Sequence, residues 1–390
     1  MREKAIRRSP VVVLASLFAV TLLATVGCGN HTAEPDAIAE PSAPVSEALN
    51  NLVRSGMPGA QAVISGPDGQ RAVTAGAGDL GTGAPYADRA HFRIGSVTKT
   101  FVATVVLQLA EMGTVELDTP IERYLPGVVQ GAGNDGNRIT VRQLLQHTSG
   151  LGDFAPEDAA HKLPQQLDQT SDGMAYRDLA AADLVRIAMT MPPQFEPGAQ
   201  FQYTNTNYVL LGMMIERLTG QRLAAEIDAR ILKPLALHDT YFPVAGETGL
   251  RDPHPLGYHN VDGKWVDATT MEAAWAGAAG AMISTGADLN QFITALTTGK
   301  LFPTRQLAQM QTAMPMAPGA EMNYGLGLIR FQVPCGRQQK EVWGHSGGIP
   351  GFSTLTIATP AGTAATVSVN TEQTNDQFST ALTAIICALA

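Results

Sequence analysis

The sequence predicts an α+β fold: an antiparallel sheet flanked by terminal helices, with a mostly helical lobe inserted between the N-terminal and C-terminal strands. Three observations support this prediction. Two short strand candidates lie near the start of the chain, helices and loops fill the region from about 115 to 310, and strand patterns return in roughly the last 70 residues. Strands at both ends of a chain with helices between them are expected to meet in one sheet.

The N-terminal elements are predicted to be a helix and a hairpin. Residues 45–54 have the spacing of a first helix. The two strand candidates, near residues 62–65 and 72–77, are separated by Gly66-Pro67-Asp68-Gly69. This is a strong turn signal, because proline fixes φ and glycine accepts conformations that other residues avoid.

The remaining elements follow from hydrophobic periodicity. A helix is expected from Ser96 to Gly113, with an apolar stripe on one side. Further helical segments are expected at 141–145, 180–189 and 208–218. The C-terminal region is predicted to contain strands at 325–333, 340–344, 352–359 and 364–370, and then a helix at 376–389.

Residues 1–27 have the features of a signal peptide. Four basic residues within the first eight positions precede a 16-residue apolar run from Val11 to Val26, which is short for a membrane span. The segment Thr25-Val26-Gly27-Cys28 resembles a bacterial lipoprotein cleavage site, at which Cys28 is lipidated and becomes the mature N-terminus, although Thr25 departs from the usual aliphatic residue. An ordinary secretory signal or an uncleaved anchor is the alternative.

Residues 28–45 are predicted to be a flexible tether, and residues 46–390 a single folded domain. Removing residues 1–27, with four basic groups and one acidic group, changes the formal charge from −9 to −12. An acidic chain of this kind is not expected to bind nucleic acid, because phosphate contacts need clustered Lys and Arg. The only membrane contact expected is through the lipid anchor.

Cys335 and Cys387 are the only cysteines that remain once Cys28 is lipidated. An exported compartment permits disulfides, so we expect these two residues to pair. Two buried free thiols are the alternative.

The segment Ser96-Val97-Thr98-Lys99 places a candidate nucleophile and a candidate base on one helical face. Residues three apart on a helix are neighbours, so Lys99 Nζ can reach Ser96 Oγ. A serine hydroxyl is a poor nucleophile until an adjacent group takes its proton.

Two further motifs lie downstream of Ser96. Tyr203-Thr204-Asn205 precedes a predicted helix, and His345-Ser346-Gly347-Gly348 lies at the end of a predicted strand. The order S-x-x-K, Y-x-N, H-S-G resembles that of the penicillin-recognising serine hydrolases, in the branch of class C β-lactamases, Streptomyces-type D-alanyl-D-alanine carboxypeptidases and related carboxylesterases. The similarity covers roughly residues 50–390 and includes 92–95, 139–151, 195–198 and 324–327.

The resemblance implies a β-lactamase/transpeptidase-like fold and a role for each residue. Ser96 would attack a carbonyl group and form an acyl-enzyme. Lys99 and Tyr203 would move protons, and which of them is the base in acylation stays open. Asn205 would hold Lys99 and the substrate amide, and the backbone N–H groups of Ser96 and Gly348 would form the oxyanion hole.

The third motif departs from the family pattern. It usually begins with a lysine whose ammonium attracts a substrate carboxylate, whereas this chain has His345. An unperturbed imidazole is only partly charged at neutral pH, so anion binding is expected to be weaker unless Arg330 or Arg337 assists. Ser346 is expected to face the substrate.

The segment from Gly344 to Gly348 also fits G-x-S-x-G, the nucleophile elbow of α/β-hydrolases. That fold needs its catalytic histidine after the serine, and His345 is the last of eight histidines in the chain. Ser346 is therefore rejected as the nucleophile. The structural alternatives are a loop aromatic for Tyr203, a helix N-cap for Asn205 and a structural side chain for His345.

No cofactor and no metal are expected, because no cysteine cluster exists and four further histidines lack ligand spacing: His161, His238, His254 and His259. His147 and Ser149 are expected to shape a loop beside the site. The function expected is an exported serine hydrolase for small-molecule or peptide substrates, D-alanyl-D-alanine carboxypeptidase-like or weakly β-lactamase-like. A carboxylesterase with the same machinery is the first alternative, and a non-catalytic wall-binding or regulatory protein is the second.

Overall fold

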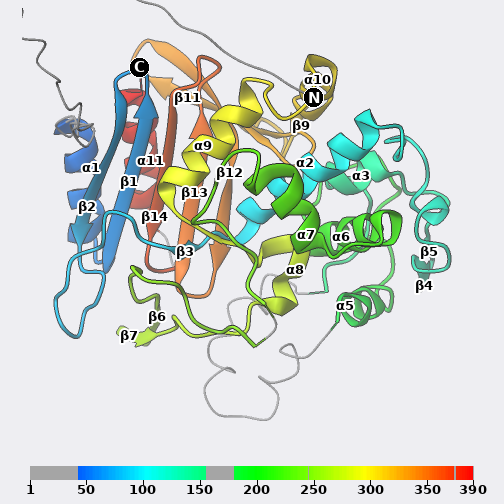
Figure 1. The fold of residues 1–390 in the computed structure, drawn as a ribbon, viewed down its shortest axis with the longest axis horizontal. Coiled ribbons are helices and arrows are strands. Elements are labelled where there is room, and N and C mark those ends of the chain that lie inside the picture. Colours follow the sequence, from blue (N-terminus) through cyan, green and yellow to red (C-terminus); the bar gives the residue numbers. More distant parts are fainter. Residues whose placement is uncertain (1–42, 155–179, 245, 373–374, 390) are drawn as a thin grey trace, which may run out of the picture. The chain divides into compact units, whose positions relative to one another are not determined.

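A computed structural model describes residues 43–154, 180–244, 246–372 and 375–389. It confirms the predicted α+β fold, with one eight-stranded antiparallel sheet in the order β2-β1-β14-β13-β12-β11-β10-β9 (Figure 1). The expected signal peptide, Cys28 and residues 28–42 of the tether lie outside the described residues. Residues 43–45 form the first turn of a helix, so the folded domain begins before the predicted end of the tether.

The strands of the large sheet are β1 Gly59–Gly66, β2 Gly69–Gly76, β9 Met314–Pro315, β10 Met322–Tyr324, β11 Ile329–Cys335, β12 Gln338–Ile349, β13 Phe352–Ala358 and β14 Ala364–Val369. Three small two-stranded sheets, which the sequence did not predict, pair β3 Phe92–Arg93 with β8 Ile283–Ser284, β4 Gln130–Gly131 with β5 Asn134–Asp135, and β6 Tyr258–Val261 with β7 Lys264–Asp267. The predicted hairpin is present, with Gly66 opposite Gly69.

The described helices are α1 Ala43–Arg54, α2 Thr98–Glu111, α3 Val141–Leu145, α5 Ala181–Ala188, α6 Asn205–Thr219, α7 Leu223–Ile227, α8 Gly277–Gly280, α9 Gly286–Thr297, α10 Thr304–Met310 and α11 Asp376–Ala388. Most of them belong to the helical lobe between β2 and β9 (Figure 1). None of the helices in the described ranges is both long and apolar enough to cross a bilayer.

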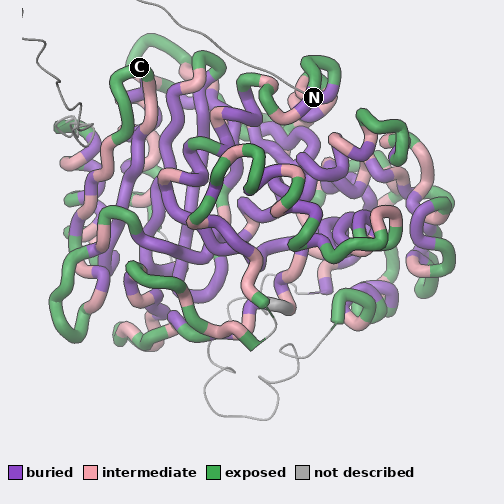
Figure 2. The backbone as a smooth tube through the Cα atoms, in the orientation of Figure 1, coloured by how far each residue is buried: buried purple, intermediate pink, exposed green. Residues whose placement is uncertain are grey.

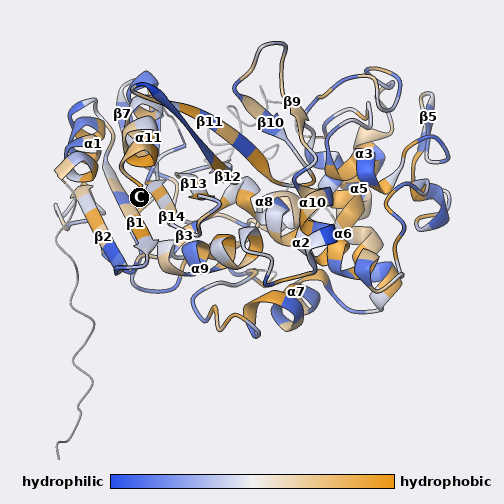
Figure 3. Ribbon diagram, turned by 90° about the horizontal axis from the view of Figure 1, so that it is seen from above, coloured by the Kyte–Doolittle hydropathy of each residue, from blue (hydrophilic) through white to orange (hydrophobic). Residues whose placement is uncertain are grey.

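The two terminal helices cover one face of the large sheet (Figure 3). In α1 the buried residues Val45, Leu49 and Leu52 recur at helical spacing and pack with α11 against the sheet. A disulfide joins Cys335 at the end of β11 to Cys387 in α11, with a Cα–Cα distance of 5.4 Å. It ties the C-terminal helix to the sheet, in the pairing expected from the sequence.

Helix α2 lies in the middle of the larger core and is buried on nearly all sides, rather than along one stripe (Figure 2). Its threonines Thr98, Thr100 and Thr104 are buried and hydrogen-bonded. Thr100 Oγ1 donates to the carbonyl of Gly327 at 2.8 Å, and Thr98 Oγ1 accepts from the N–H of Met282 at 3.2 Å. Burial of these hydroxyl groups costs little free energy, because each of them has a hydrogen-bond partner.

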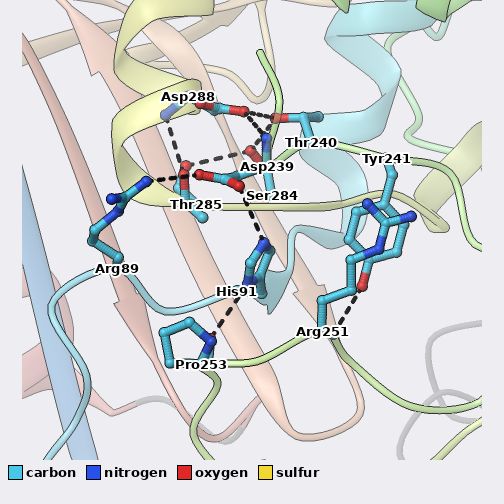
Figure 4. Close-up of polar contacts among 10 residues, drawn as sticks. All are labelled: Arg89, His91, Asp239, Thr240, Tyr241, Arg251, Pro253, Ser284, Thr285 and Asp288. Carbon is cyan, nitrogen blue, oxygen red and sulfur yellow. Dashed lines mark hydrogen bonds and ion pairs between the residues drawn. The ribbon is translucent and has the colours of Figure 1, made fainter.

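A polar network anchors β8, the strand that pairs with the segment leading to Ser96 (Figure 4). Asp288 Oδ2, at the start of α9, accepts from the N–H of Asp239 at 3.0 Å and from Thr240 Oγ1 at 2.7 Å. Thr240 Oγ1 also contacts Ser284 Oγ of β8 at 2.8 Å. This network fixes β8, and β8 in turn positions β3 just before Ser96.

Strand β12 extends well beyond the predicted residues 340–344, so His345–Gly348 lie within the strand rather than after it. Pairing with β13 continues from Trp343 to Ile349, and it stabilises a glycine-rich segment that has little strand propensity of its own. The third motif is therefore held by backbone hydrogen bonds on a rigid element.

Candidate active site

Ser96 lies in a 3₁₀ turn, Gly95–Val97, between β3 and the first residue of α2. Its side chain is half-buried. The helix starts two residues later than predicted, but the spacing to Lys99 is preserved because the turn runs directly into α2. Ser96 therefore sits at the boundary between the large sheet and the helical lobe.

Lys99 is completely buried, and its ammonium nitrogen has three oxygen neighbours. Nζ lies 3.0 Å from Ser96 Oγ, 2.9 Å from Asn205 Oδ1 and 2.7 Å from the carbonyl oxygen of Ala279. The last of these belongs to the C-terminal end of the short helix α8, where a carbonyl lacks an N–H partner within the helix.

Burial lowers the pKa of Lys99 to about 7, and the negative charge of Asp153 opposes this shift. The neighbours decide what the neutral amine can do. Carbonyl and amide oxygens can only accept, so Asn205 Oδ1 and the Ala279 carbonyl take the two N–H groups of a neutral amine. Its lone pair is then left for the proton of the Ser96 hydroxyl.

Asn205 is the first residue of α6, and the N-cap of this helix is Thr204, whose side chain accepts from the N–H of Thr206. Asn205 is therefore not the helix cap that the structural alternative proposed. Both its backbone N–H and its Nδ2 donate to Asp153 Oδ2, at 2.9 and 3.1 Å. These bonds orient the amide so that Oδ1 points to Lys99.

Tyr203 stacks beside Lys99, with Nζ 4.8 Å from the centre of the phenol ring. Burial raises the pKa of Tyr203 well above its ordinary value. Its hydroxyl has no partner at normal hydrogen-bond geometry among the described residues, although the nearby Ser96 hydroxyl moderates the rise of that pKa. The phenol is thus protonated around neutral pH.

His147 supports Tyr203 from behind, with ring centres 4.2 Å apart. Its Nδ1 accepts from the backbone N–H of Thr204 and lies 3.2 Å from Asn207 Nδ2, so the proton of the neutral ring is on Nε2. Burial lowers the pKa of His147 well below its ordinary value. Ser149 Oγ donates to Asn207 Oδ1 at 2.7 Å, so His147 and Ser149 both fix their loop to α6 beside the site, as expected.

His345 is buried and uncharged, so it does not supply the positive charge of the lysine that is usual at this position. Its Nδ1 faces the backbone carbonyl of Ser346, and its Nε2 lies 2.9 Å from the hydroxyl of Tyr324. A carbonyl only accepts, so Nδ1 carries the proton and Nε2 accepts from Tyr324. Burial lowers the pKa of His345 to about 3. The ring lies in the wall of the site, whereas Ser346 and Gly348 are exposed.

The two arginines proposed to assist His345 lie at different places. Arg337 is in the turn between β11 and β12, eight residues before His345 and therefore roughly 26 Å along the strand. It cannot serve this site. Arg330 is opposite Trp343, on the same sheet face as His345.

The segment from Ile94 to Ser96 packs tightly against the last part of β12. A Cβ on Gly347 would lie 2.0 Å from the Ile94 carbonyl oxygen and 3.0 Å from the Ser96 nitrogen. A Cβ on Gly95 would lie 2.9 Å from the Gly348 nitrogen. The glycines therefore allow a close approach between the segment 94–96 and the end of β12, which carry the two predicted oxyanion donors, the backbone N–H groups of Ser96 and Gly348.

Substituting Gly347 by alanine is expected to lower kcat/KM about 100-fold or more, because the new Cβ pushes β12 away from Ser96 and separates the two donors. Steady-state ester hydrolysis and a thermal unfolding curve would measure this. Gly249→Ala is the matched control, since its Cβ has open space. A Gly347→Ala enzyme with wild-type kcat/KM would contradict this geometry.

Two groups of the site were missed by sequence reasoning: the Asp153 carboxylate and the Ala279 carbonyl. Asp153 lies just after the matched segment 139–151, but nothing in the local sequence indicates its contact with Asn205, 52 residues away. A backbone carbonyl such as that of Ala279 leaves no side-chain signal at all.

A serine hydroxyl that faces a buried lysine, on a sheet-and-helix body of this kind, defines a serine hydrolase. A family model described as Beta-lactamase matches residues 39–390, and the chain belongs to this family. The resemblance inferred from the sequence motifs is thereby confirmed.

Individual relatives differ in their named activities. The chain is similar to Esterase EstB of Burkholderia gladioli, with 31% identity over 278 residues that cover 65% of this chain and 70% of that protein. A D-stereospecific amidohydrolase from Streptomyces sp. superposes with a TM-score of 0.80 and 37% identity, covering 89% of this chain and 98% of the other. A D-amino acid amidase from Ochrobactrum anthropi SV3 gives a TM-score of 0.74 and 28% identity, with 88% and 96% covered.

Proposed function

We propose that this enzyme hydrolyses uncharged amide and ester bonds, with D-aminoacyl amides as the main substrate class, through an acyl-enzyme on Ser96. The observation that carries the proposal is the set of hydrogen bonds around Lys99. Two fixed acceptors, Asn205 Oδ1 and the Ala279 carbonyl, leave the third position on Nζ for Ser96 Oγ at 3.0 Å.

In the proposed acylation, Ser96 Oγ forms a bond to the substrate carbonyl carbon while its proton passes to neutral Lys99. The backbone N–H groups of Ser96 and Gly348 stabilise the oxyanion. The bond to the leaving group then breaks, and Tyr203 gives its proton to the departing nitrogen or oxygen. The Lys99 ammonium returns a proton to Tyr203, so both groups are restored. Water then attacks the acyl-enzyme by the reverse proton path.

The uncharged wall of the site supports amides and esters over carboxylate-bearing substrates. With the pKa of His345 near 3, no positive charge stands at the position where the family usually has a lysine. A terminal D-alanine or a penicillin, whose carboxylate needs such a charge, would depend on Arg330. The names of the two amidase structures support the D-aminoacyl class.

The test compares D-phenylalanine amide, L-phenylalanine amide and p-nitrophenyl acetate as substrates of the wild-type enzyme and of Ser96→Ala. We expect Ser96-dependent turnover of the acetate ester and of the D-amide, with at least roughly tenfold preference for D over L. Intact-protein mass after exposure to benzylpenicillin is recorded in parallel, and little adduct is expected.

Two outcomes would contradict this proposal. Stable penicilloylation together with cleavage of an N-acyl-D-alanyl-D-alanine peptide, and no amide turnover, would establish the carboxypeptidase-like function. Turnover of short acyl esters without any amide hydrolysis would establish a carboxylesterase.

We also propose that the enzyme is exported and held at the membrane by a lipid on Cys28. The basic start, the apolar run and Gly27-Cys28 support this, and a disulfide suits an oxidising compartment. Cell fractionation of wild type and Cys28→Ser would test it. The wild-type enzyme is expected in the membrane fraction and the variant outside it, and equal distribution would contradict the anchor.

A further inference from the structure

We propose that Asp153 is a positioning residue of this enzyme, which fixes the orientation of the Asn205 amide and supplies the negative charge that balances the buried Lys99. The inference rests on the proposed function, in which neutral Lys99 is the base.

Hydrogen bonds hold Asp153 at the start of helix α6. Its segment, residues 152–154, is bound to the N-terminal turn of α6. Thr206 Oγ1 donates to the carbonyl of Gly152 at 2.8 Å and accepts from the N–H of Phe154 at 3.2 Å. The carboxylate of Asp153 then meets the first backbone N–H of a 15-residue helix, that of Asn205. A helix N-terminus favours a negative charge, so Asp153 is ionised.

Asp153 fixes the orientation of the Asn205 amide. Asp153 Oδ2 accepts from Asn205 Nδ2 at 3.1 Å, and an ionised carboxylate can only accept. The amide therefore has one orientation, with Nδ2 toward Asp153 and Oδ1 toward Lys99. If the amide turned over, its N–H₂ would face the Lys99 amine, and Lys99 would lose one of the two acceptors that direct its lone pair to Ser96.

The charge of Asp153 also acts on the buried Lys99. Among the described residues, five titratable side chains lie around Lys99: Asp153, His147, Tyr203, Tyr208 and His345. The two histidines are neutral and the two phenols are protonated, because burial disfavours every charged form. Among these groups, the charge of Asp153 is the one that favours the Lys99 ammonium.

The test is the pH dependence of kcat/KM for p-nitrophenyl acetate, with Ser96 acylation followed by intact mass. In Asp153→Asn, loss of the charge lowers the Lys99 pKa. The rise of kcat/KM with pH on the acid side of the profile, the acid limb, therefore moves to lower pH by about one unit. The plateau falls roughly 10- to 100-fold, because the Asn205 amide is no longer fixed in one orientation. Asp153→Glu keeps the charge and is expected to restore the acid limb close to its wild-type pH.

Thr206→Val is the matched control, because it removes hydrogen bonds between the same two segments without changing any charge. It is expected to lower Tm and leave the acid limb where it is. If Asp153→Asn does not fold, Asp153→Ser, whose hydroxyl can accept from the Asn205 N–H, carries the same expectation for the limb.

An acid limb that stays at the wild-type pH in the uncharged variants overturns the role of Asp153, whatever their plateau. This result is distinct from failure of the proposed function. If wild-type Ser96 is not acylated, the proposed function itself is refuted, whereas normal wild-type acylation with an unmoved limb refutes only the inference about Asp153.

Discussion

Ser96→Ala is expected to abolish acyl-enzyme formation and to lower kcat/KM for ester and amide substrates by about 10⁵- to 10⁶-fold. The alanine keeps the 3₁₀ turn and the start of α2, since Ser96 makes no capping bond that holds this turn together. The oxyanion donors and the Lys99 network stay in place, but no oxygen remains to form the ester bond. Intact-protein mass during turnover, together with stopped-flow detection of the product burst, measures the effect.

Ser346→Ala is the control for this experiment, because Ser346 is the serine of the competing G-x-S-x-G motif. It lies on β12, exposed, and its neighbour His345 is engaged with Tyr324 and a backbone carbonyl rather than with the Ser346 hydroxyl. We expect a change in kcat/KM below roughly tenfold. A folded Ser346→Ala enzyme as inactive as Ser96→Ala would instead make Ser346 the nucleophile.

The parts of the fold that sequence reasoning predicted well are those with local causes. Helix α3 was predicted with its observed bounds, and the structure shows a local cause for its start, a capping box formed by Thr140 and Gln143. Strands β13 and β14 are buried segments of apolar, serine and threonine residues between turn residues, and their predicted bounds were correct to within one residue. The hairpin of β1 and β2 follows from its turn residues.

The parts that were missed depend on contacts between distant segments. Strand β12 was predicted too short, since Gly347 and Gly348 disfavour strands in isolation and the pairing with β13 makes them extended. In α2 the sequence predicted an apolar stripe, whereas burial extends around most of the helix, because threonines such as Thr100 find hydrogen-bond partners from elsewhere in the chain.

In the candidate site, too, the local contacts were predicted and the contacts between distant segments were missed. The Ser96–Lys99 contact is local, and its spacing predicted it. The charge state of His345 was not predictable, because it depends on burial against Tyr324 rather than on residue type. Asp153 could not be found either, since its importance arises only when residues 152–154 dock on α6.

Burial connects these observations into one account of the site. It removes the charge from His345 and His147 and keeps Tyr203 protonated. It also lowers the pKa of Lys99 to about 7, so that roughly half of the enzyme has a neutral amine at neutral pH. A buried lysine can therefore act as a base where an exposed one, which is almost fully protonated, cannot.

Lys99→Ala is expected to lower kcat/KM by about 10³- to 10⁴-fold and to remove the pH dependence that this lysine causes. In the wild type only the neutral amine can accept the Ser96 proton, so kcat/KM should rise with pH through about 7 and level off above it. His345, with a pKa of about 3, and Tyr203, with a pKa raised by burial, do not titrate in this window. The measurement is kcat/KM for p-nitrophenyl acetate between about pH 5 and 9.

The pH dependence of kcat/KM separates Lys99 from Tyr203 as the group that accepts the Ser96 proton. If Tyr203 were the base in the free enzyme, its raised pKa would give a rate that keeps rising far above neutral pH, and Lys99→Ala would not flatten the profile near 7. Because alanine leaves space between Asn205 Oδ1, the Ala279 carbonyl and Ser96 Oγ, an added small primary amine should restore part of the rate. A Lys99→Ala enzyme that keeps the wild-type acid limb would show that another group accepts the Ser96 proton.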